Sequence, residues 1–120
     1  AMIETKEAVE NLDQILSVPN LTGVYIGPAD MSSSYGLPPK FDVREDPVFS
    51  NIKFIAKKAQ EYGKIAGIHN GSTAYAKEMI KIGYKFVTIL SDFRVMSSNS
   101  QKIVEEMKDT KNEGKDTSTY

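Results

Sequence analysis

Two carboxylates stand at or shortly after the ends of apolar runs, and their placement suits a metal site. Glu4 ends a short apolar run at residues 2–3, and Asp30 closes the segment Gly27-Pro28-Ala29-Asp30 after the apolar run 23–26. Carboxylate oxygens are the hard ligands that Mg²⁺ and Mn²⁺ prefer. From the residues alone, other roles stay open. Glu4 could pair with a lysine or cap a helix, and Asp30 could be the N-cap of the following turn.

The elements that must position these groups follow from the apolar spacing, which predicts four alternating strand–helix units. Apolar residues recur at three- and four-residue steps in each predicted helix, and Gly63 and Gly83 mark two helix ends. The predicted strands are 2–4, 23–26, 65–69 and 86–90, and the predicted helices are 6–16, 47–62, 72–82 and 95–107. A long loop runs from Gly27 to about residue 46. The polar segment 108–120 is predicted to be a disordered tail.

Unbroken apolar strands that alternate with helices predict an α/β fold with a parallel, helix-covered sheet. Four such units make half of an eight-fold (β/α) barrel, which needs about 250 residues. A four-strand open sheet is the alternative at this length. In either case the chemistry belongs at the carboxyl ends of the strands, where Glu4, Asp30, His69 and Asp92 fall.

Composition excludes several classes of function. The net charge of −1 in 120 residues argues against a nucleic-acid partner, which needs clustered Lys and Arg. Cysteine is absent, which removes disulfides and thiolate chemistry and suits a cytoplasmic protein. No apolar run approaches the roughly 20 residues that span a bilayer. Because the chain opens inside a predicted strand, we expect the N-terminal part of a longer protein to precede it.

Two segments resemble a known family. Ile3-Glu4-Thr5-Lys6-Glu7-Ala8 and Gly27-Pro28-Ala29-Asp30-Met31-Ser32 are similar, in order, spacing and strand context, to the C-terminal half of HpcH/HpaI aldolases, the citrate lyase β-like group. The resemblance covers about residues 2–107. It implies a TIM-type (β/α)₈ barrel, usually assembled into hexamers, of which residues 1–107 would form the last four units. It also implies a metal-dependent, class II pyruvate aldolase that acts on 4-hydroxy-2-oxo acids.

The resemblance also implies roles for particular residues. Glu4 and Asp30 would hold Mg²⁺ or Mn²⁺, with Co²⁺ as a further candidate. Gly27 would let pyruvate approach the main chain, and the amides of Ala29 and Asp30 would donate to its carboxylate; Pro28 has no N–H to donate. A plain strand-exit turn is the alternative for these residues. The family's histidine base and arginine belong to the N-terminal half, so no catalytic residue is expected here.

His69 is the only histidine. We expect it to line the pocket of the acceptor aldehyde or to bind a substrate hydroxyl; a structural hydrogen bond and a role as base are the alternatives. Asn70 and Ser72 would support the same pocket, although Ser72 also suits a helix N-cap. The loop 32–39 is interpreted as a cover over the acceptor side, with a flexible polar connection as the alternative.

Two other functions remain open from the sequence. An acyl-CoA lyase of the malyl- or citramalyl-CoA type would share the metal carboxylates but needs a CoA groove, and no basic patch for one is evident. A non-catalytic α/β module that binds a metal or an anion is the second.

A half-barrel would expose strand edges and apolar side chains. We therefore expect a homo-oligomer or pairing with the missing half-barrel, with pyruvate and an aldehyde as small-molecule partners and no membrane partner.

Overall fold

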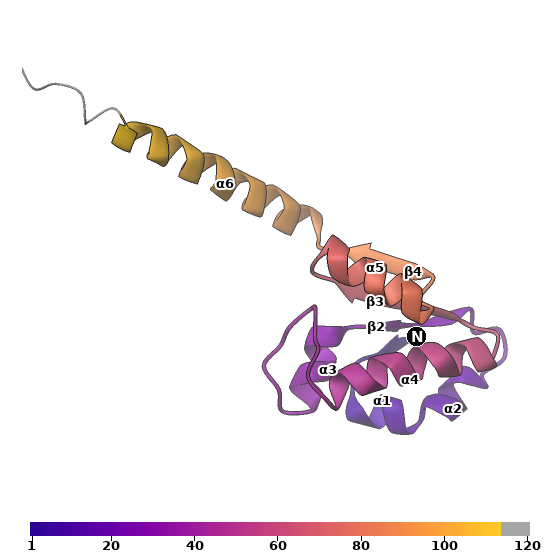
Figure 1. The fold of residues 1–120 in the computed structure, drawn as a ribbon. Coiled ribbons are helices and arrows are strands. Elements are labelled where there is room, and N and C mark those ends of the chain that lie inside the picture. The colour runs from indigo at the N-terminus through magenta and orange to yellow at the C-terminus, as the bar shows by residue number, and fades with distance from the viewer. Residues whose placement is uncertain (114–120) are drawn as a thin grey trace, which may run out of the picture. The chain divides into compact units, whose positions relative to one another are not determined.

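The computed structural model describes residues 1–113, with side chains as far as Lys108. Its four strands form one parallel sheet in the order β1-β2-β3-β4 (Figure 1). The strands are β1 (Met2–Ile3), β2 (Gly23–Ile26), β3 (Ile65–Asn70) and β4 (Phe86–Ile89). The helices are α1 (Lys6–Glu10), α2 (Leu12–Leu16), α3 (Pro28–Ser34), α4 (Val48–Glu61), α5 (Thr73–Ile82) and α6 (Asp92–Glu113). The predicted alternation of strands and helices in a parallel α/β fold is confirmed.

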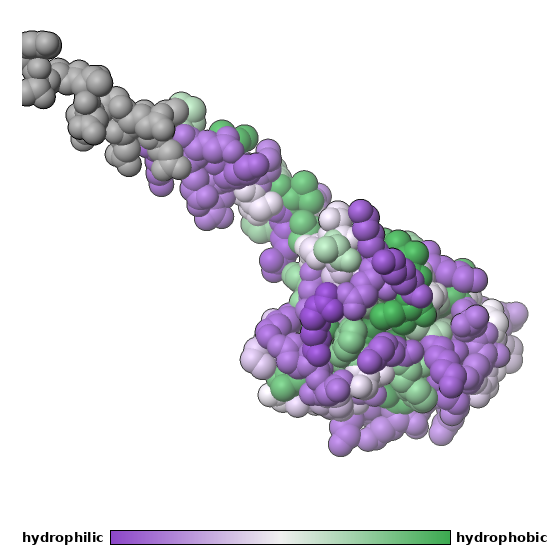
Figure 2. All heavy atoms as spheres, viewed as in Figure 1, coloured by the Kyte–Doolittle hydropathy of each residue, from purple (hydrophilic) through white to green (hydrophobic). Residues whose placement is uncertain are grey.

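Helices cover one face of the sheet. Figure 1 shows α1, α2 and α4 on the same side, and α5 packs against β3 and β4. The strand side chains that point to this side include Ile3, Ile26 and Ile68, which are fully buried. Each buried isoleucine contributes about 1.5–3 kcal/mol of hydrophobic stabilisation. In the view of Figure 2, hydrophilic residues cover most of the surface over α1, α2 and α4, as expected for helices that pack only one face inward.

The opposite face of the sheet is open within residues 1–89. Side chains alternate along a strand, and Met2, Tyr25, Gly67 and Phe86 align across the four strands on this face. Met2 is 52% exposed and Phe86 is 56% exposed. A Cβ at Gly67 would lie 2.8 Å from the Tyr25 ring and 2.9 Å from the Phe86 ring. Glycine therefore allows these two rings to meet across β3, with their centroids 5.7 Å apart.

Two elements within residues 1–89 differ from the prediction. The helix predicted over 6–16 is divided into α1 and α2 at Asn11, whose φ of −95° and ψ of 14° leave the helical region. The Asn11 Nδ2 donates to Glu7 O over 2.9 Å, and such local side-chain bonds compete with the helix. Helix α3 occupies part of the predicted loop. It begins at Pro28, a favoured first helical residue, and Ser32 Oγ donates back to Pro28 O over 2.7 Å.

The chain divides into two compact units, residues 1–89 and 90–120. All candidate site residues belong to the first unit except Asp92, which begins α6 in the second. Helix α6 begins at Asp92, before its predicted start at Val95, and continues to Glu113, beyond its predicted end at Met107, so residues 108–113 of the predicted disordered tail are helical. The rest of the predicted tail, 114–120, lies outside the described residues. Within residues 1–113, no helix combines the length and apolar character needed to cross a bilayer.

Candidate metal and substrate site

The carboxyl ends of β1 and β2 bring Glu4 and Asp30 to the same place. Ile3 pairs with Ile26, so Glu4 emerges beside Gly27. Glu4 Oε2 lies 3.0 Å, and Asp30 Oδ2 3.4 Å, from the position that a Cβ atom on Gly27 would take. Two carboxylates that are far apart in sequence therefore converge over a glycine, whose missing side chain leaves the gap between them.

Neither carboxylate serves the structural roles that the sequence left open. Thr5 is the N-cap of α1, where its Oγ1 accepts from Ala8 N over 3.1 Å. Gly27 is the N-cap of α3, so Asp30 lies inside the first turn. Among the side chains that the structure describes, no ion pair involves Glu4 or Asp30. Glu4 is half-buried and Asp30 is exposed, so both can reach a ligand from the open side.

A cavity of about 160 Å³ adjoins the carboxylates on the open face of the sheet. Its walls come from three strand ends, the start of α3 and the loop before α4. The lining residues are Met2, Tyr25, Gly27, Pro28, Ala29, Asp30, Phe41 and His69. The structure thus gathers His69 and the Gly27–Asp30 segment around one hollow, with Glu4 next to it through Gly27.

His69 is held by residues that the sequence did not single out. Its Nδ1 lies 2.9 Å from Thr88 Oγ1, which in turn lies 2.5 Å from the Tyr25 hydroxyl. The Phe41 ring meets the His69 ring edge-on, with centroids 4.9 Å apart. Strand alternation could have placed Tyr25 and Thr88 on the face of Gly27 and His69. No local pattern signals Phe41, because it approaches from a loop.

Asn70 and Ser72, which were expected to support the pocket, do not line the cavity, and the alternative of a helix N-cap is confirmed for Ser72. Asn70 is fully buried, and its Nδ2 donates to Ile68 O over 3.0 Å and to Thr88 O over 2.9 Å. It therefore ties β3 to β4. Ser72 is the N-cap of α5, accepting from Tyr75 N over 3.2 Å. Both residues act on the frame of the site.

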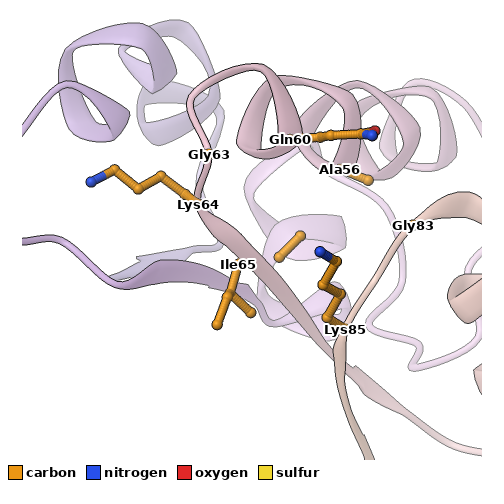
Figure 3. Close-up of a pocket in the computed structure, with 8 residues that line it drawn as sticks. Ala56, Gln60, Gly63, Lys64, Ile65, Gly83 and Lys85 are labelled. Atoms are coloured by element: carbon orange, nitrogen blue, oxygen red, sulfur yellow. The ribbon is translucent and has the colours of Figure 1, made fainter.

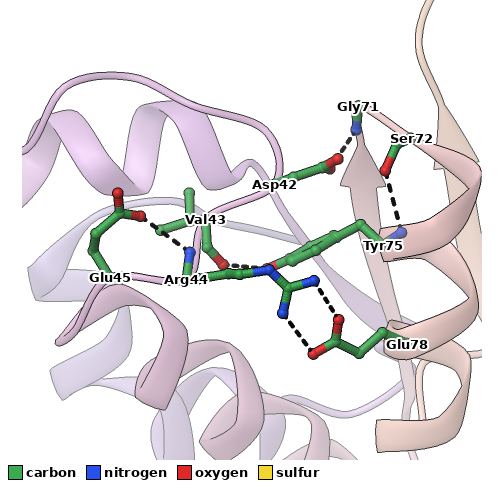
Figure 4. A network of polar contacts seen from close by, with 8 residues as sticks. All are labelled: Asp42, Val43, Arg44, Glu45, Gly71, Ser72, Tyr75 and Glu78. Carbon is green, nitrogen blue, oxygen red and sulfur yellow. Dashed lines mark hydrogen bonds and ion pairs between the residues drawn. The ribbon is translucent and has the colours of Figure 1, made fainter.

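The loop before α4 is fastened to the β3–α5 junction by a polar network (Figure 4). Asp42 Oδ1 accepts from Gly71 N over 2.7 Å, and the Tyr75 hydroxyl donates to Val43 O over 2.6 Å. Arg44 forms two parallel hydrogen bonds with Glu78, at 3.0 and 2.7 Å. Burial raises the pKa of the Tyr75 hydroxyl, which keeps it a donor. These contacts fix the loop segment next to Phe41, which lines the cavity.

Residues 32–39, which were interpreted as the cover, do not line the cavity. Ser32 to Ser34 belong to α3. The hydroxyl of Tyr35 accepts from Asn51 Nδ2 over 2.9 Å, which ties this part of the chain to α4. The polar connection therefore has fixed contacts on the helix-covered side, and Phe41 is the loop residue that reaches the cavity.

The Arg44–Glu78 pair should make stability depend on pH in the acid range. The hydrogen bond from Arg44 holds the pKa of Glu78 below its ordinary value of 4.5. A depressed pKa in the folded state stabilises the fold above the unfolded pKa, and this contribution is lost as pH falls through the folded pKa. We expect Arg44→Met to lower the urea midpoint at pH 7, with the difference from wild type vanishing as pH falls towards about 2.

Lys57→Met, which removes a looser surface contact at 3.9 Å, should show no such pH-dependent difference. A difference for Arg44→Met that is constant with pH would contradict the expectation.

A second hollow, of about 210 Å³, lies at the other end of the strands (Figure 3). It is bordered by Gly63 and Gly83, which follow the carboxyl ends of α4 and α5. In Figure 3 the Lys64 side chain points away from Lys85. Among the described side chains no carboxylate lines this hollow, and it lies at the amino ends of the strands, whereas ligands of parallel α/β sheets bind at the carboxyl ends. The smaller cavity beside Glu4 and Asp30 is therefore the better candidate.

The donor set beside the smaller cavity limits what it can hold. Within the described residues, no group of three or more His, Cys, Asp or Glu side chains could enclose a metal ion. A metal at Glu4 and Asp30 would have two protein carboxylates and would take its other ligands from water and substrate. Mg²⁺ commonly binds in this way, through one or two carboxylates plus waters and substrate oxygens.

Known proteins resemble this chain in sequence and in fold. A profile of the HpcH/HpaI aldolase/citrate lyase family matches residues 1–110. The hydroxypyruvate/pyruvate aldolase of Rhizorhabdus wittichii is 38% identical over 104 residues, which are 87% of this chain and 41% of that protein. The 4-hydroxy-2-oxo-heptane-1,7-dioate aldolase of Escherichia coli is 33% identical over 101 residues, which are 84% of this chain and 38% of that protein.

The fold has a counterpart among solved structures. The HpcH/HpaI aldolase from Desulfitobacterium hafniense matches with a TM-score of 0.83 at 24% sequence identity, over 90% of this chain and 41% of that one. The chain therefore spans about two fifths of the length of the relatives it matches. The profile match over nearly the whole chain and the similarity to named aldolases lead to one conclusion: this chain belongs to the HpcH/HpaI aldolase/citrate lyase family.

Proposed function

We propose that this chain carries the metal-binding part of a metal-dependent pyruvate aldolase, a carbon–carbon lyase acting on 4-hydroxy-2-oxo acids. The observation that supports this most directly is the convergence of Glu4 Oε2 and Asp30 Oδ2 over Gly27. Membership of an aldolase family agrees with it. In this proposal residues 1–107 are the last four units of a (β/α)₈ barrel in the cytoplasm, and further units complete the active site.

Glu4 and Asp30 would hold Mg²⁺ or Mn²⁺, with Co²⁺ as a further candidate. The fit rests on two hard oxygen donors that flank one gap and form no ion pair among the described side chains. When bound, such a cation supplies the positive charge that offsets negative charge developing on the keto oxygen during carbon–carbon cleavage.

The neighbouring residues would bind and orient the two substrates. The amides of Ala29 and Asp30 lie in the first turn of α3, where a helix offers them no carbonyl acceptor, and we assign them to the pyruvate carboxylate. Pro28 fixes the start of this turn without a competing N–H. His69 and Phe41 form the wall on the acceptor side of the cavity, where the aldehyde would lie.

Gly27→Ala tests this site with little risk to the fold. The glycine has φ −97° and ψ 92°, which alanine adopts readily, but the new methyl would stand 3.0 Å from Glu4 Oε2. We expect Mn²⁺ affinity, measured by electron paramagnetic resonance, to fall about 10-fold or more, as when groups around a metal are displaced. Glu7→Ala is the control, because this exposed residue of α1 has no place at the gap. A wild-type chain that binds no Mn²⁺, or a Gly27→Ala variant that binds it as well as wild type, would refute the site.

The open face of the sheet would be the assembly surface in this proposal. It carries Met2, Ile65 and Phe86, which are 52%, 42% and 56% exposed. Large apolar side chains gathered on one face are typical of an interaction surface. We propose that further β/α units cover it. For the isolated chain, the available units are those of a second copy.

Self-association of the isolated chain can be tested with two matched substitutions. Ile65→Lys places a charge on the open face, and Ile80→Lys places one on α5, where Ile80 is 53% exposed. We expect Ile65→Lys to weaken association about 10-fold or more, since desolvating an unpaired charge is costly, and Ile80→Lys to leave it unchanged. Sedimentation velocity over a range of concentrations measures both. Equal association of the two variants would contradict an assembly through this face.

A further inference from the structure

The open face carries a chain of three polar side chains that ends at the only histidine. Tyr25 on β2, Thr88 on β4 and His69 on β3 meet at Thr88 Oγ1, with separations of 2.5 Å to the tyrosine oxygen and 2.9 Å to His69 Nδ1. The backbone of Thr88 is also held in place, because Asn70 Nδ2 donates to its carbonyl oxygen over 2.9 Å. The His69 and Phe41 rings lie in a T-shaped arrangement. The imidazole is thus held on two sides.

The direction of the hydrogen bonds follows from counting protons. A threonine hydroxyl has one proton to donate and two lone pairs to accept with. If Tyr25 donates to Thr88, then Thr88 donates to His69 Nδ1, and both hydroxyl protons have acceptors. In the reverse order His69 Nδ1–H donates to Thr88 and Thr88 donates to Tyr25. That order leaves the tyrosine proton without an acceptor among the described residues. If Tyr25 and His69 Nδ1–H both donate to Thr88, the threonine proton is left without one instead. In the first order the proton left over is on His69 Nε2, the ring nitrogen outside these contacts, and both hydroxyl protons are paired. The phenol is also the more acidic hydroxyl and so the better donor.

We propose that Tyr25 and Thr88 are positioning residues that fix His69 as the tautomer with its proton on Nε2. His69 Nδ1 is then an acceptor used within the protein, and Nε2–H is a donor with no partner among the described residues. Since His69 lines the cavity with Gly27 and Asp30, this donor serves a ligand oxygen there, such as an aldehyde carbonyl or a carboxylate. The role of the ligand rests on the proposed function, but the order of the hydrogen bonds does not. His69 acts as a hydrogen-bond donor and not as a base.

The single histidine makes the test direct. Long-range ¹H–¹⁵N spectra of the labelled chain at alkaline pH, where imidazole is neutral, contain ring signals from His69 alone. We expect a protonated Nε2 and an unprotonated Nδ1 in one tautomer. Thr88→Val removes the hydroxyl at nearly constant shape and should shift both nitrogen signals towards those of a free histidine peptide. Thr88→Ser keeps a hydroxyl and should restore the wild-type signals. Thr73→Val, at the exposed start of α5, should change nothing.

A second arm tests the ligand. Glyoxylate, a small aldehyde with a carboxylate, added with Mg²⁺ in the millimolar range should shift the Nε2 signal in wild type, and Thr88→Val should weaken this response. A protonated Nδ1 in the wild type, or identical spectra for wild type and Thr88→Val, would overturn the tautomer assignment. An unchanged Nε2 signal with glyoxylate would overturn the ligand role. Mn²⁺ binding, measured separately, reports on Glu4 and Asp30 whichever result is obtained, so failure of the metal proposal is distinguishable.

Discussion

Glu4→Gln and Asp30→Asn should each lower the affinity of the chain for Mn²⁺ by at least about 100-fold, more than is typical for the loss of a group behind a metal ligand. Both substitutions keep the size and one oxygen of the side chain but remove its charge. Because the two carboxylates flank one gap over Gly27, neither can replace the other, and each single variant should lose most of the binding. Electron paramagnetic resonance of free Mn²⁺ gives the affinities.

The carboxylate test has a close control. Glu7 is an exposed carboxylate in the first turn of α1, near Glu4 in sequence but without a place at the gap. Glu7→Gln should therefore bind Mn²⁺ as the wild type does. Amide spectra of all three variants establish that the fold is kept. Equal Mn²⁺ affinities for Glu4→Gln, Asp30→Asn and Glu7→Gln would show that bound metal is a diffuse surface effect, and the assignment of the site would be wrong.

Ile68→Ala should cause the largest loss of stability among simple core substitutions on the sheet. Ile68 lies on β3, between β2 and β4, and is fully buried against the helix-covered side. Truncation of a fully buried isoleucine costs about 2–5 kcal/mol, because the cavity left behind cannot collapse completely. Small domains typically have only about 5–15 kcal/mol of stability. The melting temperature should therefore fall by on the order of 10 °C or more.

The same substitution at an exposed position calibrates this result. Ile80 lies on α5 and is 53% exposed, so Ile80→Ala should change stability by no more than about 0.5 kcal/mol. Thermal and urea unfolding followed by circular dichroism measure both variants. A similar small effect at both positions would mean that β3 is not the centre of the core, contrary to the structure.

Local signals in the sequence were sufficient for most of the fold. Helix α5 begins after Ser72 and ends at Gly83 as predicted, because capping and a glycine with φ of +122° act within a few residues. The split at Asn11 and the short helix α3 were not predicted. A short helix without a long apolar stripe has no periodic signature, and a proline reads equally well as a turn or as a first helical residue.

The residues of the candidate site were likewise predictable only in part. Glu4, Asp30 and His69 could be named from the sequence because each lies at or within a few residues of the end of an apolar run, and carboxyl ends of parallel strands share one edge. Phe41 could not, because it reaches the cavity through a loop whose position depends on the Arg44–Glu78 and Asp42–Gly71 contacts. Those contacts join residues from separate elements, and no local pattern records them.

The sequence by itself determined the order of the elements, the faces of the strands and the family, since these depend on periodicity, caps and short motifs along the chain. Only the tertiary structure decided that the two carboxylates meet over Gly27 and that Thr88 joins Tyr25 to His69. The physical reason is that strand register and side-chain packing bring distant residues within hydrogen-bonding reach. Such distances are set by the whole sheet and its helices and cannot be computed from neighbours in sequence.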